Sequence, residues 1–147
     1  MNTKTQLNEA MKEAMRAKDK VAKRTLMMVR AAIQLAEKDR RKELDETATL
    51  AILQKELKSR QETIAEAKKA KREDLIADTE AEIVVIKKYL PEEMSAEDLR
   101  ALTAEVVAEV GATTRKDMGK VMKIIIPRVA GRASGRDISK AVQELLA

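Results

Sequence analysis

Apolar residues recur along the first part of the chain at intervals of three, four or seven, which is the spacing of one face of a helix. The clearest stripe runs through Ala22, Thr25, Leu26, Val29, Ala32, Ile33 and Ala36. Two further stripes comprise Leu50, Leu53, Leu57 and Ile64, and then Ile76, Ile83, Ile86 and Leu90. These stripes predict long amphipathic helices that pack lengthwise. The last of them should end at Pro91, because proline disfavours helix in the residue before it.

The stripes beyond Pro91 are shorter, and each begins with an oxygen side chain followed three residues later by an acid, the pattern of a capping box. The pairs are Ser95 with Asp98, Thr114 with Asp117, and Ser134 with Asp137. The stripes comprise Leu99, Leu102, Val106 and Val110; Met118, Val121, Met122 and Ile125; and Ile138, Val142 and Leu145. The sequence therefore predicts an all-α fold, with an N-terminal helical domain at 1–92 and a small three-helix domain at 93–147.

Composition supports helices and excludes most familiar active sites. Of 147 residues, 37% are charged and 44% hydrophobic, with only four Gly and two Pro. Cysteine and histidine are both absent, which excludes disulfides, thiol nucleophiles, imidazole bases and zinc sites built from these side chains. No run of about 18 apolar residues is present, so no membrane span is predicted. The start, MNTKTQLNEAMKEAMR, lacks an apolar core and carries acids, so we expect a cytoplasmic protein without a signal peptide. An amphipathic organelle-targeting segment is the weaker interpretation, because Glu9 and Glu13 are unfavourable in such a segment.

Aromatic residues are nearly absent, with one Tyr and no Phe or Trp. A protein that recognises single-stranded bases by stacking needs such rings. If the partner is a nucleic acid, phosphate contacts and shape must therefore dominate its recognition.

Charge is distributed unevenly along the chain. Residues 1–42 carry a net charge of +7, 43–91 of −2, 92–110 of −5 and 111–147 of +5. An excess of one sign over a long stretch is more informative than the modest total of +5. Two basic regions therefore stand apart from an acidic helix.

The first basic region places cationic side chains opposite the stripe that begins at Ala22. They are Arg16, Lys20, Lys23, Arg24 and Arg30, which fall within about 120° on a helical wheel if the chain stays helical past Asp19. This pattern has two interpretations, a solvated face of a bundle helix or a surface for an anionic partner.

The second basic region follows Thr114. Its candidate phosphate-binding residues are Lys116, Lys120 and Lys123, on one helix face, followed by Arg128, Arg132 and Arg136. Residues 115–140 include eight basic residues and only two acids, Asp117 and Asp137, and both acids are candidates for helix capping. We interpret this region as a phosphate-binding surface.

Three glycines in the same region would permit close approach of another backbone. They are Gly119, Gly131 and Gly135. Gly119 lies between the lysine face and the apolar face, although glycine costs a helix interior about 1 kcal/mol relative to alanine. The approaching backbone is either a neighbouring helix or an RNA strand.

No catalytic residue, metal site or cofactor is predicted. Carboxylates spaced four apart, such as Glu9 and Glu13, are best explained as surface ion pairs, because di-iron helix bundles also need a Glu-x-x-His motif. The GRASG segment lacks the spacing of a phosphate loop, and Ser134 has no histidine to activate it. Ser134 is therefore predicted to cap a helix.

Several segments resemble the GatB/YqeY family, whose small members are similar to the C-terminal tail of the B subunit of tRNA-dependent amidotransferase. They are MKEAMRAKDK, LKSRQETI, KREDL, YLPEEMS and GATTRKDMGKVMKIIIPRVAGRASGR. The resemblance implies two helical domains and tRNA binding in support of enzymes that supply amidated aminoacyl-tRNA. It also implies the family label of a carbon-nitrogen ligase with glutamine as amido-N-donor. The chain alone has none of the ATP-binding or glutamine-hydrolysing parts of that enzyme.

The chain departs from the family pattern at a few positions. Ser134 replaces a common aspartate, Lys123 and Lys71 replace glycines, Ala67 replaces an aromatic residue, and Met27 replaces a basic residue. The first two changes make the C-terminal domain more attractive to phosphate. Met27 weakens the case for an anionic partner on the second helix.

We therefore expect a non-catalytic RNA-binding module that holds the phosphate backbone of a folded tRNA, without contact to a membrane. The alternative is a protein-interaction module, in which exposed methionines or the acidic segment Glu92–Glu109 dock on an amidotransferase subunit or an aminoacyl-tRNA synthetase. Duplex DNA suits the pattern less well, because the acidic helix would face its phosphates.

Overall fold

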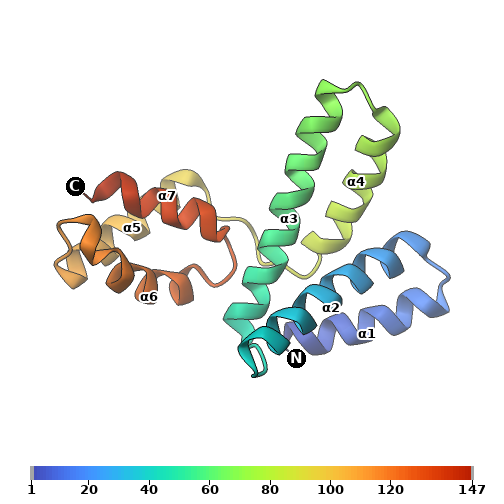
Figure 1. Ribbon diagram of the computed structural model, residues 1–147, viewed down its shortest axis with the longest axis horizontal. Coiled ribbons are helices and arrows are strands. Elements are labelled where there is room, and N and C mark those ends of the chain that lie inside the picture. The colour runs from blue at the N-terminus through green and yellow to red at the C-terminus, as the bar shows by residue number, and fades with distance from the viewer. Residues whose placement is uncertain (1, 147) are drawn as a thin grey trace. The chain divides into compact units, whose positions relative to one another are not determined.

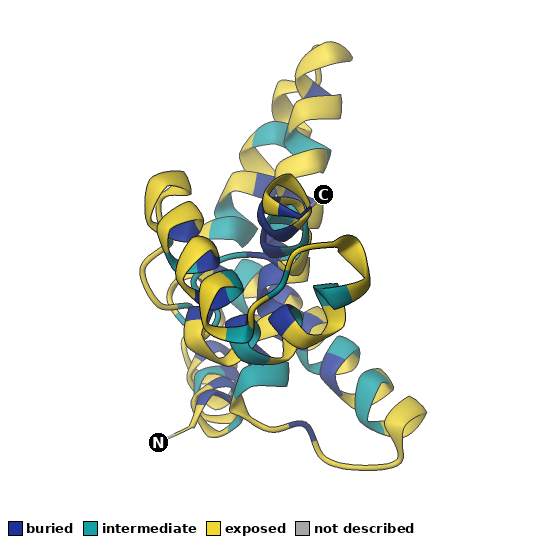
Figure 2. Ribbon diagram, turned by 90° about the vertical axis from the view of Figure 1, so that its left-hand side faces the viewer, coloured by how far each residue is buried: buried dark blue, intermediate teal, exposed yellow. Residues whose placement is uncertain are grey.

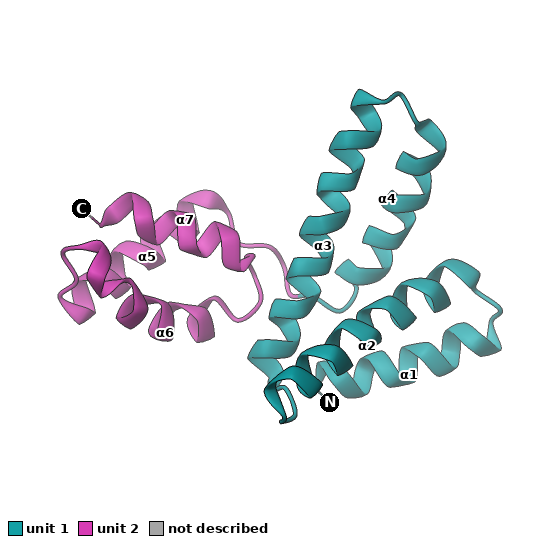
Figure 3. Ribbon diagram, viewed as in Figure 1, with its two compact units in different colours: residues 1–90 teal, residues 91–147 magenta. Residues whose placement is uncertain are grey.

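The computed structural model of the protein describes residues 2–146, and every regular element in that range is a helix (Figure 1). The prediction of an all-α fold is confirmed. The chain divides into two compact units, residues 1–90 and 91–147 (Figure 3). No helix among residues 2–146 is both long enough and apolar enough to span a bilayer.

The first unit contains four helices in two consecutive hairpins. They are α1 (Thr3–Arg16), α2 (Lys20–Arg40), α3 (Glu46–Lys69) and α4 (Glu73–Lys87). Asn2, Asp19 and Asp45 each cap the following helix, because the side-chain oxygen accepts a hydrogen bond from a free amide of its first turn.

The chain does not stay helical from α1 into α2. Lys18 has a φ of 55°, and the Asp19 carboxylate accepts a hydrogen bond from the Ala22 amide at 3.0 Å. An aspartate that caps a new helix in this way separates it from the preceding one. The condition set for a shared basic face, that the chain stay helical past Asp19, is therefore not met, and Arg16 lies on α1 rather than on the basic face of α2.

The core of the first unit lies where the predicted stripes meet. Thr25, Leu26, Val29 and Ile33 of α2 are buried, as are Leu50, Leu53 and Leu57 of α3 and Ile86 of α4. Ile64, Ile76, Ile83 and Leu90 are partly buried. Buried positions, dark blue in Figure 2, therefore follow the helical periodicity of the sequence.

Two departures from the family pattern lie near the turn from α3 to α4. Lys71 has a φ of 56°, the left-handed conformation that glycine adopts without steric cost. A hollow of about 490 Å³ is lined partly by Ala67 and Leu75, the former buried and the latter 38% exposed. Ala67 therefore contributes only a methyl group to the lining of this hollow.

The second unit contains α5 (Ala96–Val110), the 3₁₀ turn η1 (Arg115–Asp117), α6 (Met118–Val129) and α7 (Gly135–Leu145). Ser95 Oγ accepts a hydrogen bond from the Asp98 amide at 3.0 Å, and Ser134 Oγ accepts one from the Asp137 amide at 3.1 Å. The predicted helix starts at both serines are confirmed. Thr114 also precedes a helical segment, which begins as a 3₁₀ turn.

The core of the second unit contains Val106, Val121, Ile125, Val129 and Val142, all at most 1% exposed. The prediction was wrong for one residue of the apolar stripes. Leu145 is 46% exposed, and its neighbour Leu146 is buried instead. The reason is that α7 ends at Leu145, after which the extended backbone of Leu146 turns its side chain inward.

Candidate nucleic-acid interface

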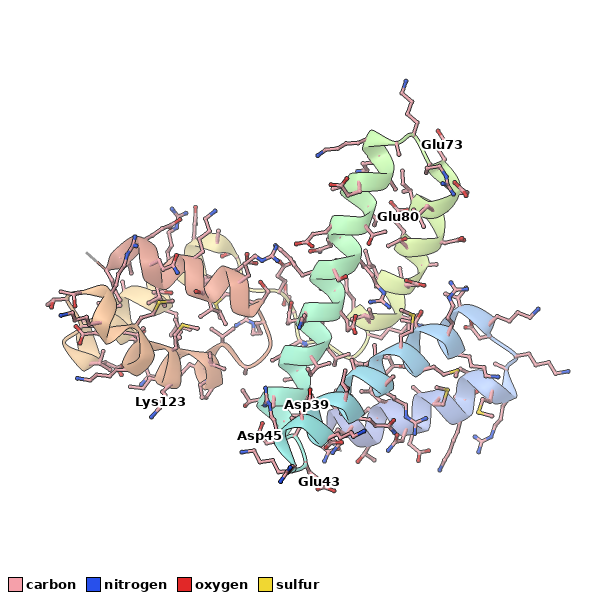
Figure 4. All side chains as sticks on the ribbon, viewed as in Figure 1. Asp39, Glu43, Asp45, Glu73, Glu80 and Lys123 are labelled. Atoms are coloured by element: carbon pink, nitrogen blue, oxygen red, sulfur yellow. The ribbon has the colours of Figure 1, made fainter. Side chains whose placement is uncertain are left out.

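Three lysines form an exposed row along the outer side of η1 and α6. Lys116 lies in η1, and Lys120 and Lys123 lie in α6. Their positions span roughly 10 Å at the rise of an α-helix. Figure 4 labels Lys123, whose side chain extends away from α6. We call Lys116, Lys120 and Lys123 the lysine row.

The inner side of α6 holds the lysine row outward. Val121 and Ile125 are fully buried, and Val129 is 1% exposed. Because these residues lie on the opposite face of the helix, the lysines cannot turn inward without loss of the core contacts. The row is therefore fixed to a rigid support.

The acid nearest in sequence to the lysine row is engaged elsewhere. Asp117 Oδ2 accepts hydrogen bonds from the amides of Thr113 at 3.0 Å and Thr114 at 3.3 Å. These bonds hold the pKa of Asp117 below its ordinary value, and the charge of Lys120 adds to the effect. Among the described residues, the side chains of Lys116 and Lys123 form no hydrogen bond or ion pair. The row therefore presents its charge to solvent.

Gly119 lies beside the lysine row and is exposed. A Cβ atom built there would meet no heavy atom within 4 Å, once the helix's own nearby backbone is set aside, and its φ is not positive. Packing against another helix of its own unit, which is one form of the first of the two predicted reasons for this glycine, is therefore not its role. The approach of an external partner stays a prediction.

The other two glycines have different settings. Gly131 has a φ of 81° and follows Ala130, which has a φ of 50°, so both residues end α6 in the left-handed conformation. Gly135 is the first residue of α7, and a Cβ atom there would meet nothing within 4 Å. Gly131 therefore has a conformational reason that needs no ligand.

The arginines that follow the lysine row do not extend it as a uniform patch. Arg128 donates two hydrogen bonds to the Glu109 carboxylate, at 2.8 and 2.7 Å, and so joins α6 to α5. This pair lowers the pKa of Glu109 and raises the pKa of Arg128. Arg128 therefore pairs through both of these nitrogens with a carboxylate of the same unit, the bidentate geometry in which arginine also binds phosphate. Arg136 is exposed at the start of α7.

Arg132 ties the turn after α6 to the segment before α5. Its Nε donates to the Glu92 carbonyl oxygen at 2.9 Å, while the Met94 amide donates to the Arg132 carbonyl oxygen at 2.8 Å. The two bonds hold residues 92–94 against this turn. Arg132 therefore has a structural role, whatever contact it makes with a ligand.

The four predicted binding residues of α2 do not share one environment. Lys20 and Lys23 are exposed, whereas Arg24 donates to Glu82 of α4 at 3.3 Å. Arg30 is partly buried on the side of α2 that faces α1, where it lines a small hollow together with Lys4. Only Lys20 and Lys23 remain as an exposed pair without an ion pair among the described residues.

One buried arginine, Arg60, was not predicted from the sequence. The Arg60 side chain is 7% exposed and donates to Glu82 at 3.0 Å and to Glu56 at 3.0 Å. Its position was nevertheless visible in the sequence, since Arg60 falls between Leu57 and Ile64 on the apolar stripe of α3. A charge inside such a stripe indicates a buried ion pair.

No group of three or more acidic side chains in residues 2–146 is arranged to hold a metal ion. The arrangement that stands out is the lysine row, which can bind phosphate oxygens through nine N–H donors and three positive charges.

Comparison with known proteins gives consistent matches over most of the chain. The model of a family described as Yqey-like protein matches residues 4–146. A protein of Pyrenophora tritici-repentis named "Altered inheritance of mitochondria protein 41, mitochondrial" is 30% identical over 146 residues, covering 95% of this chain and 78% of that protein. A protein of the same name from Kluyveromyces lactis is 33% identical over 123 residues, covering 78% of this chain and 66% of that protein.

Proposed function

Because the chain belongs to the YqeY-like protein family, we propose that it is a non-catalytic tRNA-binding module that assists a tRNA-dependent amidotransferase or another enzyme of aminoacyl-tRNA metabolism. The observation that carries this proposal is the lysine row, whose charges are exposed and held on a rigid helix. The cytoplasm is the proposed location, and cell fractionation tests it against the mitochondrial location in the relatives' names.

The chemistry of the lysine row favours the phosphate backbone over the bases. Lysine ammonium groups bind phosphate as point charges and carry little sequence information. The lone aromatic residue, Tyr89, is half-buried on the other unit, so base stacking contributes little. Recognition of one tRNA among others would therefore come from its folded shape or from the associated enzyme.

The number of phosphates can be estimated from the exposed cations. The lysine row supplies three charges, and Arg115 of η1 is also exposed beside Lys116. Neutralising about four phosphates gives a slope near −3 when the logarithm of the binding constant is plotted against that of salt concentration. Removal of one lysine should reduce the slope by roughly 1.

A salt-titrated binding assay with total tRNA and the full chain tests the proposal. The double variant Lys120→Gln with Lys123→Gln should weaken binding and lower the slope by roughly 2. The matched control is Arg100→Gln with Lys140→Gln, which removes two exposed charges that line a hollow between α5 and α7. A flat salt response, or an equal loss in both double variants, would show that the lysine row does not bind tRNA.

A further inference from the structure

The outer face of α2 has a second exposed row, which is apolar in the middle and basic at both ends. It runs through Lys20, Lys23, Met27, Ala31, Leu35 and Lys38, at intervals of three or four. Met27 is 53% exposed and Leu35 is 61% exposed. We call these six residues the outer row of α2.

Nothing in the described chain requires the apolar middle of this row to be exposed. The opposite face of α2 already supplies the core through Leu26, Val29 and Ile33. A polar residue at Met27 or Leu35 would leave those core contacts unchanged. Large apolar residues kept in a line on a solvated face are typical of a protein interface.

The hollow beside the row adds a second feature of such an interface. It measures about 400 Å³ and lies among α2, α3 and α4, and Met28, Thr63 and Leu75 share its lining with the ion-paired Arg60, Glu56 and Glu82 and with other polar residues. Met28 is 48% exposed and Leu75 is 38% exposed, so apolar surface continues from α2 toward α4. The hollow can receive a partner side chain whose apolar part contacts Met28 and Leu75.

The charges at the two ends decide the kind of partner. A second copy of α2 placed antiparallel would bring Lys20 and Lys23 against Lys38 of the other copy, and a parallel copy would pair each lysine with itself. Like charges in direct contact disfavour both arrangements. RNA would find unpaired cations only at the ends, because Met27, Ala31 and Leu35 offer no donor to phosphate and the neighbouring Arg24 is paired with Glu82.

We propose that the outer row of α2 docks an amphipathic helix of another protein, with an apolar stripe at its centre and acidic residues at both ends. The partner's stripe would cover Met27, Ala31 and Leu35, and one of its side chains would enter the hollow beside Met28. Methionine adapts well to such a surface, because its side chain is flexible and polarisable. The acids would face Lys20 and Lys38 and fix the position of the partner along the helix.

A synthetic helix of this composition provides the probe. The fluorescent peptide is about 19 residues long, the length of the row, with leucines at intervals of three and four and two glutamates at each end. The comparison peptide has lysines in place of the glutamates. Fluorescence anisotropy with the full chain should show binding of the acidic-ended peptide at least about tenfold tighter than that of the basic-ended one.

Variants locate the binding on α2. Met27→Glu with Leu35→Glu should weaken the acidic-ended peptide at least about tenfold, since apolar anchors at the centre of an interface dominate its affinity. Lys20→Glu with Lys38→Glu should reduce or reverse the preference between the peptides. Val84→Glu is the matched control, because Val84 is 59% exposed on α4 and lies outside the row. All these positions are exposed, and far-UV circular dichroism checks that each variant folds.

Several outcomes would overturn the proposal. Equal affinity for both peptides would show that the lysines at the ends of the row do not select the partner. An equal loss of peptide affinity in Val84→Glu would show that the peptide does not bind at the outer row of α2. The same assay includes total tRNA and vesicles of phosphatidylserine and phosphatidylcholine. If Met27→Glu with Leu35→Glu abolishes binding to either of these while the peptide is unaffected, the row is a nucleic-acid or membrane surface instead.

Discussion

Arg60 offers the sharpest test of what holds the first unit together. Its side chain is 7% exposed, and the guanidinium lies between the side chains of Glu82 of α4, which is 16% exposed, and Glu56 of α3, which is 23% exposed. Arg60 also donates to the Glu56 carbonyl oxygen at 3.1 Å. The substitution Arg60→Met keeps much of the side-chain volume and removes the charge.

The loss of stability in Arg60→Met depends on the partners that Glu56 and Glu82 retain. Glu82 keeps only Arg24 among its described ion-pair partners, at 3.3 Å, and Arg24 is 51% exposed. Removal of one partner of a buried ion pair costs about 3–5 kcal/mol. Because Glu56 and Glu82 stay partly hydrated, we expect a loss near the lower end, about 3 kcal/mol. For a unit of 90 residues this corresponds to a fall in Tm of roughly 12–24 °C.

Urea unfolding measures the effect, and Tyr89 supplies a local probe. Tyr89 packs against the core of the first unit and is the only tyrosine in a chain without tryptophan. Its fluorescence therefore reports on that unit, while circular dichroism reports on both units. The shift of the urea midpoint, at constant slope, gives the change in the free energy of unfolding.

Two controls separate the ion pair from other causes. Lys55→Met, at an exposed position on the same helix, should change stability by less than about 0.5 kcal/mol. Arg60→Met with Glu82→Leu should recover most of the loss, because an apolar pair avoids the isolated buried charge. A free energy of unfolding for Arg60→Met within about 1 kcal/mol of the wild-type value would contradict this role of the ion pair.

Three further predictions concern the second unit. Gly119→Ala should raise stability by up to about 1 kcal/mol, as measured by thermal unfolding, because the methyl group meets open space; if a partner's backbone approaches there, tRNA affinity should fall at the same time. Glu109→Gln should flatten the acid limb of the stability curve in urea unfolding from pH 3 to 7. The reason is that Arg128 lowers the pKa of folded Glu109, so the stabilisation is complete above the unfolded pKa of about 4.3 and is lost as pH falls through the lower folded value. Leu146→Ala should cost about 2 kcal/mol in the same assay, whereas Leu145→Ala should cost less than about 0.5 kcal/mol.

Local signals in the sequence predicted most of the helices. The serines at 95 and 134 begin helices because a hydroxyl oxygen three residues before an amide is sufficient to cap it. The turn after α1 was missed for the opposite reason. Lys18 adopts a positive φ there, although nothing in its side chain favours that conformation. Glycine is the residue that usually indicates such a turn in a sequence, and none is present at this position.

The candidate site was predictable only in part. Helical periodicity placed Lys120 and Lys123 on the outer face of α6, since that depends on spacing alone. The partner of Arg128 was not predictable, because Glu109 lies on another helix and the contact depends on how α5 and α6 pack. The same limit applies to Arg132, whose contact with Glu92 spans 40 positions.

The bonds between the turn after α6 and residues 92–94 determine where the chain can be divided. A fragment that starts at Ser95 would retain every helix of the second unit but would lose the Glu92 carbonyl and the Met94 amide as partners of Arg132. A fragment that starts at Pro91 would keep both. Anyone who isolates this unit for spectroscopy should therefore include the residues that precede its first helix, because they hold the turn after α6 in place.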